Sequence, residues 1–129
     1  MFRRYLLSAA AVLPLLLLSL SSFSTDAPKV ISTSPQNGAQ NVDPSITEIS
    51  VTFSEPMMDR SWSWSYEDKD KFPQMAGHPS YVNNMKCVLP VKLDPKKEYV
   101  VWINTWKHRN FRSKAGVPAE PFKFTFKTK

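Results

Sequence analysis

Residues 49–54 read Ile49-Ser50-Val51-Thr52-Phe53-Ser54, and this stretch decides the fold. Apolar and polar side chains alternate along it without interruption. Successive side chains of an extended chain point to opposite faces, so the pattern predicts a half-buried antiparallel strand. Residues 61–66 repeat the alternation, with three serines on one side and Trp62, Trp64 and Tyr66 on the other. We expect these three aromatic side chains to face inward and to form part of the core.

Further alternating runs lie toward the C-terminus. The odd-numbered positions of residues 85–93 are apolar, which places Cys87 on a buried face, where a thiol is inert and its pKa is raised. Pro90 falls within this run and has no N–H donor, so the strand is expected at a sheet edge or with a bulge there. The run over residues 98–104 is apolar on both faces, and residues 122–127 place three phenylalanines on one face.

These patterns define the fold class. Short strands are predicted near residues 29–33, 49–54, 61–66, 81–82, 85–93, 98–104 and 122–127, with turn residues between most of them. About seven short strands in a domain of this length predict an all-β, antiparallel β-sandwich of the immunoglobulin type. Cys87 is the only cysteine, so no internal disulfide can form and aromatic side chains must hold the two sheets together.

The first 24 residues differ in composition from the rest. Two arginines precede the uncharged run Tyr5–Leu20, and Ser22 and Ser24 give a small-x-small cleavage pattern. The alternative is an uncleaved anchor helix, but the run is shorter than the ~20 residues that span a bilayer and it contains Pro14. We predict a signal peptide over residues 1–24 and one domain over residues 25–129, secreted, periplasmic or on the cell surface.

Composition excludes several classes of protein. The chain has 129 residues with 17 basic and 11 acidic side chains, and removal of both leader arginines reduces its net charge from +6 to +4. No block of five like charges occurs, so a nucleic-acid-binding stripe is not predicted. One cysteine also excludes a zinc ribbon, which needs at least two thiolates.

Five segments carry a resemblance to a known family: Pro28–Ala39, Val42–Pro44, Ile49–Met57, Tyr99–Ile103 and Phe122–Thr128. Together they resemble bacterial Ig-like domains of the SbsA type. The resemblance implies a non-enzymatic module of exported and cell-surface proteins, used as a spacer, scaffold or binding unit. We therefore expect no cofactor, and an unidentified envelope protein or glycan as the partner. Contact with the membrane is expected only through the export signal.

Residues that could carry chemistry give one alternative. Neither histidine sits in a nucleophile motif, and Glu55 and Asp59 are explained as acids of a solvated turn, so we expect no enzymatic activity. The alternative is a periplasmic copper carrier similar to the CopC family, which has a comparable start but whose N-terminal His and late Asp-Gly-His are absent here. Its soft ligands would come from Met57, Met58, Met75, Met85, His78 and His108.

Two tryptophans suggest a binding surface. Alternation places Trp102, Asn104 and Trp106 opposite the apolar face of residues 99–103, where a two-layer sandwich normally meets water. Either the loop over residues 67–80 covers that face, or it is an exposed apolar patch that binds a protein or glycan. The candidate binding surface is Trp102, Trp106, Lys107, His108 and Arg109.

Overall fold

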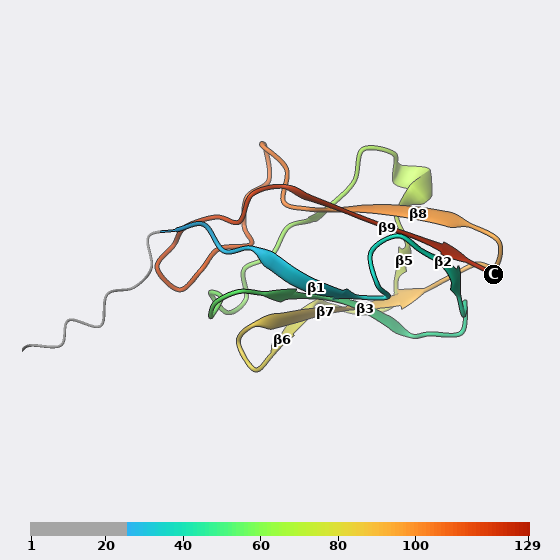
Figure 1. Cartoon of the computed structure of the whole chain (residues 1–129), viewed down its shortest axis with the longest axis horizontal. Coiled ribbons are helices and arrows are strands. Elements are labelled where there is room, and N and C mark those ends of the chain that lie inside the picture. Colours follow the sequence, from blue (N-terminus) through green and yellow to red (C-terminus); the bar gives the residue numbers. More distant parts are fainter. Residues whose placement is uncertain (1–25) are drawn as a thin grey trace, which may run out of the picture.

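The computed structural model describes residues 26–129, so the predicted signal peptide lies outside the described residues. Nine strands and one short 3-10 helix, η1, make up the regular structure of this part of the chain (Figure 1). Their bounds are β1 Val30–Ser34, β2 Ala39–Val42, β3 Glu48–Phe53, β4 Trp64–Ser65, η1 Lys69–Lys71, β5 Gln74–Met75, β6 Ser80–Val82, β7 Lys86–Lys92, β8 Glu98–Ile103 and β9 Phe122–Thr128.

The strands form two sheets, and the predicted all-β sandwich is confirmed. One sheet has the order β1-β3-β7-β5, with β6 also paired to β7, and the other has the order β2-β9-β8-β4. All pairs are antiparallel except β2 with β9. Two strands, β2 and β5, were absent from the prediction, and the run over residues 61–66 forms only the two-residue strand β4.

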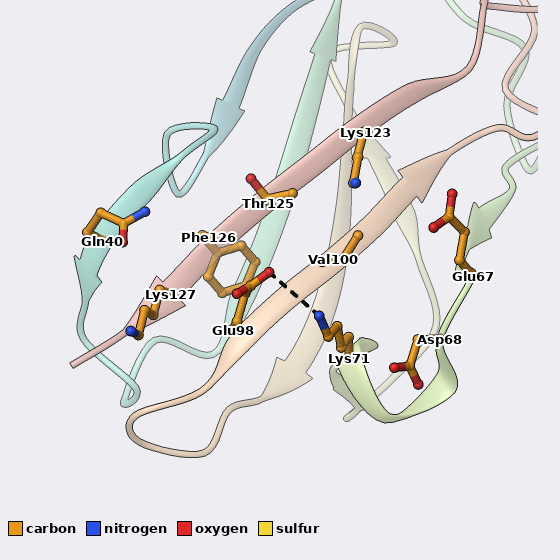
Figure 2. A pocket seen from close by; sticks show the side chains of 10 residues that line it. All are labelled: Gln40, Glu67, Asp68, Lys71, Glu98, Val100, Lys123, Thr125, Phe126 and Lys127. Carbon is orange, nitrogen blue, oxygen red and sulfur yellow. Dashed lines mark ion pairs between the residues drawn. The ribbon is translucent and has the colours of Figure 1, made fainter.

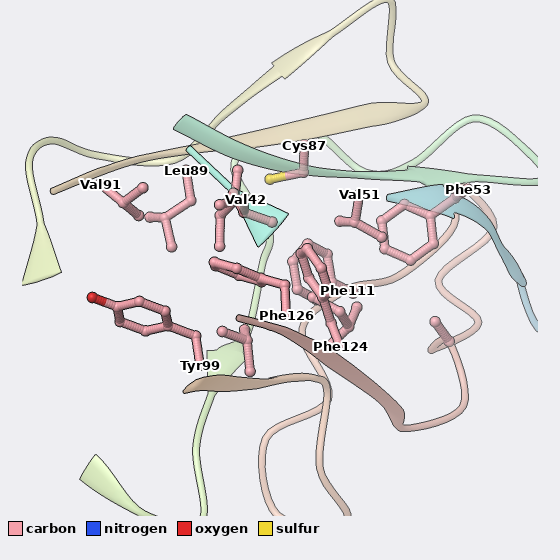
Figure 3. Close-up of a cluster of buried hydrophobic side chains, with 14 of the residues drawn as sticks. Val42, Val51, Phe53, Cys87, Leu89, Val91, Tyr99, Phe111, Phe124 and Phe126 are labelled. Atoms are coloured by element: carbon pink, nitrogen blue, oxygen red, sulfur yellow. The ribbon is translucent and has the colours of Figure 1, made fainter. Parts of the chain in front are cut away.

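The core lies between the two sheets and is built from the alternating faces of their strands (Figure 3). Val51 and Phe53 of β3 face Phe124 and Phe126 of β9, and all four side chains are buried. Tyr99 stacks on Phe126 with ring centroids 5.2 Å apart. Buried aromatic rings therefore fill much of the space between the two sheets.

Cys87 lies in this core and is fully buried, as predicted. Burial raises the pKa of its thiol to about 12, although the neighbouring Trp64 side chain works in the opposite direction. The thiol is therefore uncharged at neutral pH and behaves as a small apolar side chain.

The sequence predicted that Pro90 would place its strand at a sheet edge or at a bulge. The edge position is wrong. β7 lies inside its sheet, between β3 on one side and β5 and β6 on the other. The pairing is interrupted on the neighbouring segment instead. The residues between β5 and β6 leave the hydrogen-bonded ladder opposite Pro90. The Ala76 N–H still donates to the Pro90 carbonyl at 2.9 Å. Gly77 has no Cβ, which suits this position. A Cβ there would lie 3.2 Å from Cγ of Pro90, closer than most such contacts.

The aromatic run over residues 62–66 is only partly in the core. The Trp64 ring packs edge-on against Phe111 at 5.5 Å, and Trp62 packs against Tyr81 at 6.3 Å. Tyr66 is 48% exposed, so its predicted core position is wrong. The reason is that β4 ends at Ser65, so the strand alternation does not continue to Tyr66.

Candidate functional site

Asn104 ends β8 and fixes the course of the chain that follows. It is fully buried and has a φ of 63°, a left-handed conformation that asparagine tolerates. Its Nδ2 donates to the carbonyls of Phe111 at 3.0 Å and Ala119 at 2.8 Å, and its Oδ1 accepts from the Phe111 N–H at 2.9 Å. The predicted outward position of Asn104 is wrong, because the strand alternation ends one residue earlier, at Ile103.

The loop over residues 104–119 is held against the end of the sandwich. Phe111 is fully buried and lies 5.2 Å from the Phe53 ring. Backbone bridges join Met57 to Ser113 and Arg112 to Pro118. The alternation of apolar and polar residues did not predict that this loop contributes to the core. The loop nevertheless supplies Phe111, one of the largest buried side chains.

Residues 105–109 form a tight turn, which we call the Trp106 turn. The Thr105 N–H donates to the His108 carbonyl at 2.8 Å, while Thr105 Oγ1 accepts from the N–H groups of Lys107 and His108. Trp106 is 76% exposed, and the Arg109 guanidinium lies 5.6 Å from its ring centroid. Lys107, His108 and Arg109 are also exposed. The turn therefore presents an aromatic ring and basic groups to solvent from a hydrogen-bonded backbone.

Trp102 has a different environment from Trp106. It is half-buried on the outer face of β8, where its cross-strand neighbours are Ser65 of β4 and Lys123 of β9. Its indole nitrogen is shielded from solvent and has no hydrogen-bond partner among the described residues. The chain thus places the two tryptophans of the candidate surface in unlike settings, one shielded and one exposed.

The first part of the loop that one alternative expected to cover this face lies beside β8. Residues 67–71 face Val100 and Lys123 across a shallow pocket (Figure 2). The Lys71 ammonium pairs with Glu98 at 3.8 Å, and both side chains are largely exposed. Exposed ion pairs contribute little to stability, so this pair does little to fix the shape of the pocket.

A groove lies beside the Trp106 turn, along the edge strand β4. It has a volume of about 540 Å³, and we call it the aromatic groove. Five of its lining residues come from residues 62–66, and Met75, Pro79, His108 and Asn110 complete it. Tyr66 and Met75 are each 48% exposed. His108 belongs to both the turn and the groove, so the two features form one continuous surface.

The excess positive charge of the domain lies in the 104–119 loop. Residues 26–129 carry 15 basic and 11 acidic side chains. The loop contributes four basic residues and no acidic one, so the rest of the domain is balanced. The basic residues are Lys107, Arg109, Arg112 and Lys114. A count of charges by segment could have found this signal in the sequence.

The soft ligands proposed for copper lie on several elements. Met57 is buried at 1% exposure, whereas Met75 and His108 line the aromatic groove together. Within residues 26–129 no group of three or more His, Cys, Asp or Glu side chains is arranged to hold a metal ion.

Two packed sheets whose end loops carry an exposed aromatic surface define an immunoglobulin-like β-sandwich module. The chain belongs to the bacterial Ig-like domain family, whose family model matches residues 24–128. A solved structure, the S-layer protein rSbsC(31-844), aligns with a TM-score of 0.43 and 18% identity. The alignment covers 81% of this chain but 14% of the S-layer protein. No curated protein matches the sequence significantly.

Among the described residues, no helix is long and apolar enough to cross a membrane.

Proposed function

We propose that this protein is a non-catalytic, exported interaction module of the cell envelope, which binds an envelope protein or glycan. Membership of the bacterial Ig-like family supports an exported module without catalytic activity. Neither the family nor the fold identifies the binding partner, because a fold alone does not determine function. The side chains on the surface of the domain therefore decide what it binds.

The exposure of Trp106 carries the proposal. A tryptophan that is 76% exposed leaves most of its apolar ring in water, which is unfavourable unless a partner covers the ring. The Thr105 hydrogen bonds hold the backbone beneath it, so little conformational entropy is lost on binding. Binding hot spots are enriched in tryptophan, tyrosine and arginine, and the turn with its groove offers Trp106, Arg109 and Tyr66.

The residues of the candidate surface take different roles in this proposal. Trp106, Lys107, His108 and Arg109 contact the partner, and the aromatic groove extends the contact area through Tyr66. Trp102, which is half-buried, supports the outer face of β8 beneath that surface.

Retention on isolated bacterial envelopes tests the proposal. A protein of residues 25–129 is incubated with washed envelope fractions, and the bound fraction is measured for the native sequence, Trp106→Ala and Ile31→Ala. Ile31 is the matched control, because it is 61% exposed but lies on β1 at the other edge of the sandwich. We expect Trp106→Ala to weaken retention at least tenfold while Ile31→Ala leaves it unchanged. Equal retention of all three proteins would contradict the proposal.

Copper carriage remains the second candidate function, because Met75 and His108 line one groove. Thioether and imidazole groups are ligands that copper accepts. Titration of the same protein with Cu(I) and Cu(II) separates the two functions. A stoichiometric, sub-micromolar site that is lost in His108→Ala would favour the copper carrier over the interaction module.

A further inference from the structure

The basic loop lies at the end of the sandwich where the chain enters it. Figure 1 shows the first described residues at the same end as the 104–121 segment. Residues 26–30 and 120–122 also line one shallow pocket, which confirms that the two segments adjoin. The C-terminal part of the 104–121 segment therefore adjoins the chain entry.

The predicted export signal precedes Asp26, so a membrane lies near the chain entry of the domain during export. The apolar run Tyr5–Leu20 ends six residues before Asp26. Six residues reach at most about 20 Å when fully extended. While that run is in a bilayer, the chain entry and the 120–122 segment beside it lie within about 20 Å of the lipid headgroups.

The chemistry of the turn suits a headgroup layer. Tryptophan partitions to the membrane interface, where its ring meets the acyl boundary and its N–H stays hydrated. Basic side chains beside it are attracted to anionic headgroups. Lys107 and Arg109 are exposed, and neither forms an ion pair within the described part of the chain.

Acidic residues of this end lie on the adjoining segments. Glu120 follows the loop in sequence, and the backbone bridge from Met57 to Ser113 brings the segment with Glu55 and Asp59 beside it, whereas the loop itself contributes no acidic residue. The loop itself therefore carries only basic charges, and it also carries the exposed Trp106 ring.

We propose that the Trp106 turn docks the domain onto an anionic membrane surface, with Trp106 at headgroup depth and Lys107 and Arg109 against lipid phosphates. This inference rests on the proposed interaction module and assigns its surface a lipid partner in place of a protein or glycan. It also assigns a role to the membrane beyond the export signal.

Vesicle co-sedimentation tests the docking. Both sheets and the whole buried core lie within Val30–Thr128, so a protein of residues 25–129 contains everything the fold needs and lacks the apolar leader. It is mixed with vesicles of phosphatidylcholine, alone or with added phosphatidylglycerol. We expect binding to the anionic vesicles that weakens as salt is added, and little binding to phosphatidylcholine alone.

Three variants and a matched control locate the contact. Lys107→Gln and Arg109→Gln are each expected to lower the partition coefficient about fivefold, and Trp106→Ala about tenfold. Lys96→Gln is the control, because Lys96 is exposed in the turn at the opposite end of β8. We expect the control to bind as the native protein does.

Two results would overturn the inference: no binding to the anionic vesicles, or an equal loss in Lys96→Gln and Lys107→Gln. If vesicle binding fails but retention on envelopes still depends on Trp106, the interaction module stands and its partner is a protein or glycan. If Trp106→Ala changes neither measurement, both proposals fail.

Discussion

Replacement of Asn104 by alanine tests how the candidate surface is held in place. The change removes three hydrogen bonds and leaves the Ala119 carbonyl and the Phe111 N–H without partners, while the Phe111 carbonyl still accepts from the Ala119 N–H. These groups belong to Phe111 and Ala119, which are 0% and 1% exposed, so water cannot readily replace the lost amide. Each unsatisfied buried group costs about 1–3 kcal/mol, so the two groups give a total loss of about 2–6 kcal/mol.

That loss is a large share of the stability expected for a domain of this size, about 5–15 kcal/mol. Urea unfolding followed by tryptophan fluorescence measures it directly. Asn110→Ala is the matched control, because Asn110 is exposed, and it should change the free energy of unfolding by less than about 0.5 kcal/mol. If Asn104→Ala lowers the free energy of unfolding by less than about 1 kcal/mol, Asn104 does not hold the loop and this account of the site is refuted.

Three further predictions concern the sandwich beneath the surface. Burial raises the pKa of Cys87 from 9.0 to about 12. As the pH rises, the thiol therefore loses its proton in the unfolded chain before it does so in the folded one. This stabilises the unfolded state, so the free energy of unfolding falls by about 1 kcal/mol between pH 9 and 10. Urea unfolding should show a smaller loss in Cys87→Ala, and an unchanged pH slope would show that the thiol is not buried. Trp102→Ala should destabilise the domain by about 2–4 kcal/mol, and a thermal scan that finds no shift would place the ring in solvent. Gly77→Ala should cost about 1–2 kcal/mol by pressing on Pro90, whereas an unchanged urea midpoint would show that the chain shifts freely there.

The sequence predicted the sandwich because its long strands alternate cleanly. In β3 and β9 the apolar positions recur at every second residue, and all of the strongest runs lie in these strands or in β7 and β8. The two missed strands, β2 and β5, have two to four residues each, which is too short for a period of two to stand out. Their existence depends on partners distant in sequence.

The candidate site was harder to predict because it depends on where a strand ends. Alternation carried Trp102, Asn104 and Trp106 to one face, but a left-handed residue at Asn104 breaks the period. Asparagine is among the residues that adopt this conformation, so a turn signal was present in the sequence. The aromatic groove needs β5 and β7 to pair before Met75 can approach residues 62–66, and no local pattern encodes that approach.

Chemical-shift mapping tests most directly the central claim that the Trp106 turn and its groove form the binding surface. The ¹⁵N-labelled protein of residues 25–129 is titrated with anionic phospholipid bicelles and, separately, with soluble peptidoglycan fragments. We predict that one of these ligands shifts the amide signals of residues 105–110 and Tyr66, with little change on β1 and β2. Shifts confined to β1 and β2, or no shifts with either ligand, would contradict the claim.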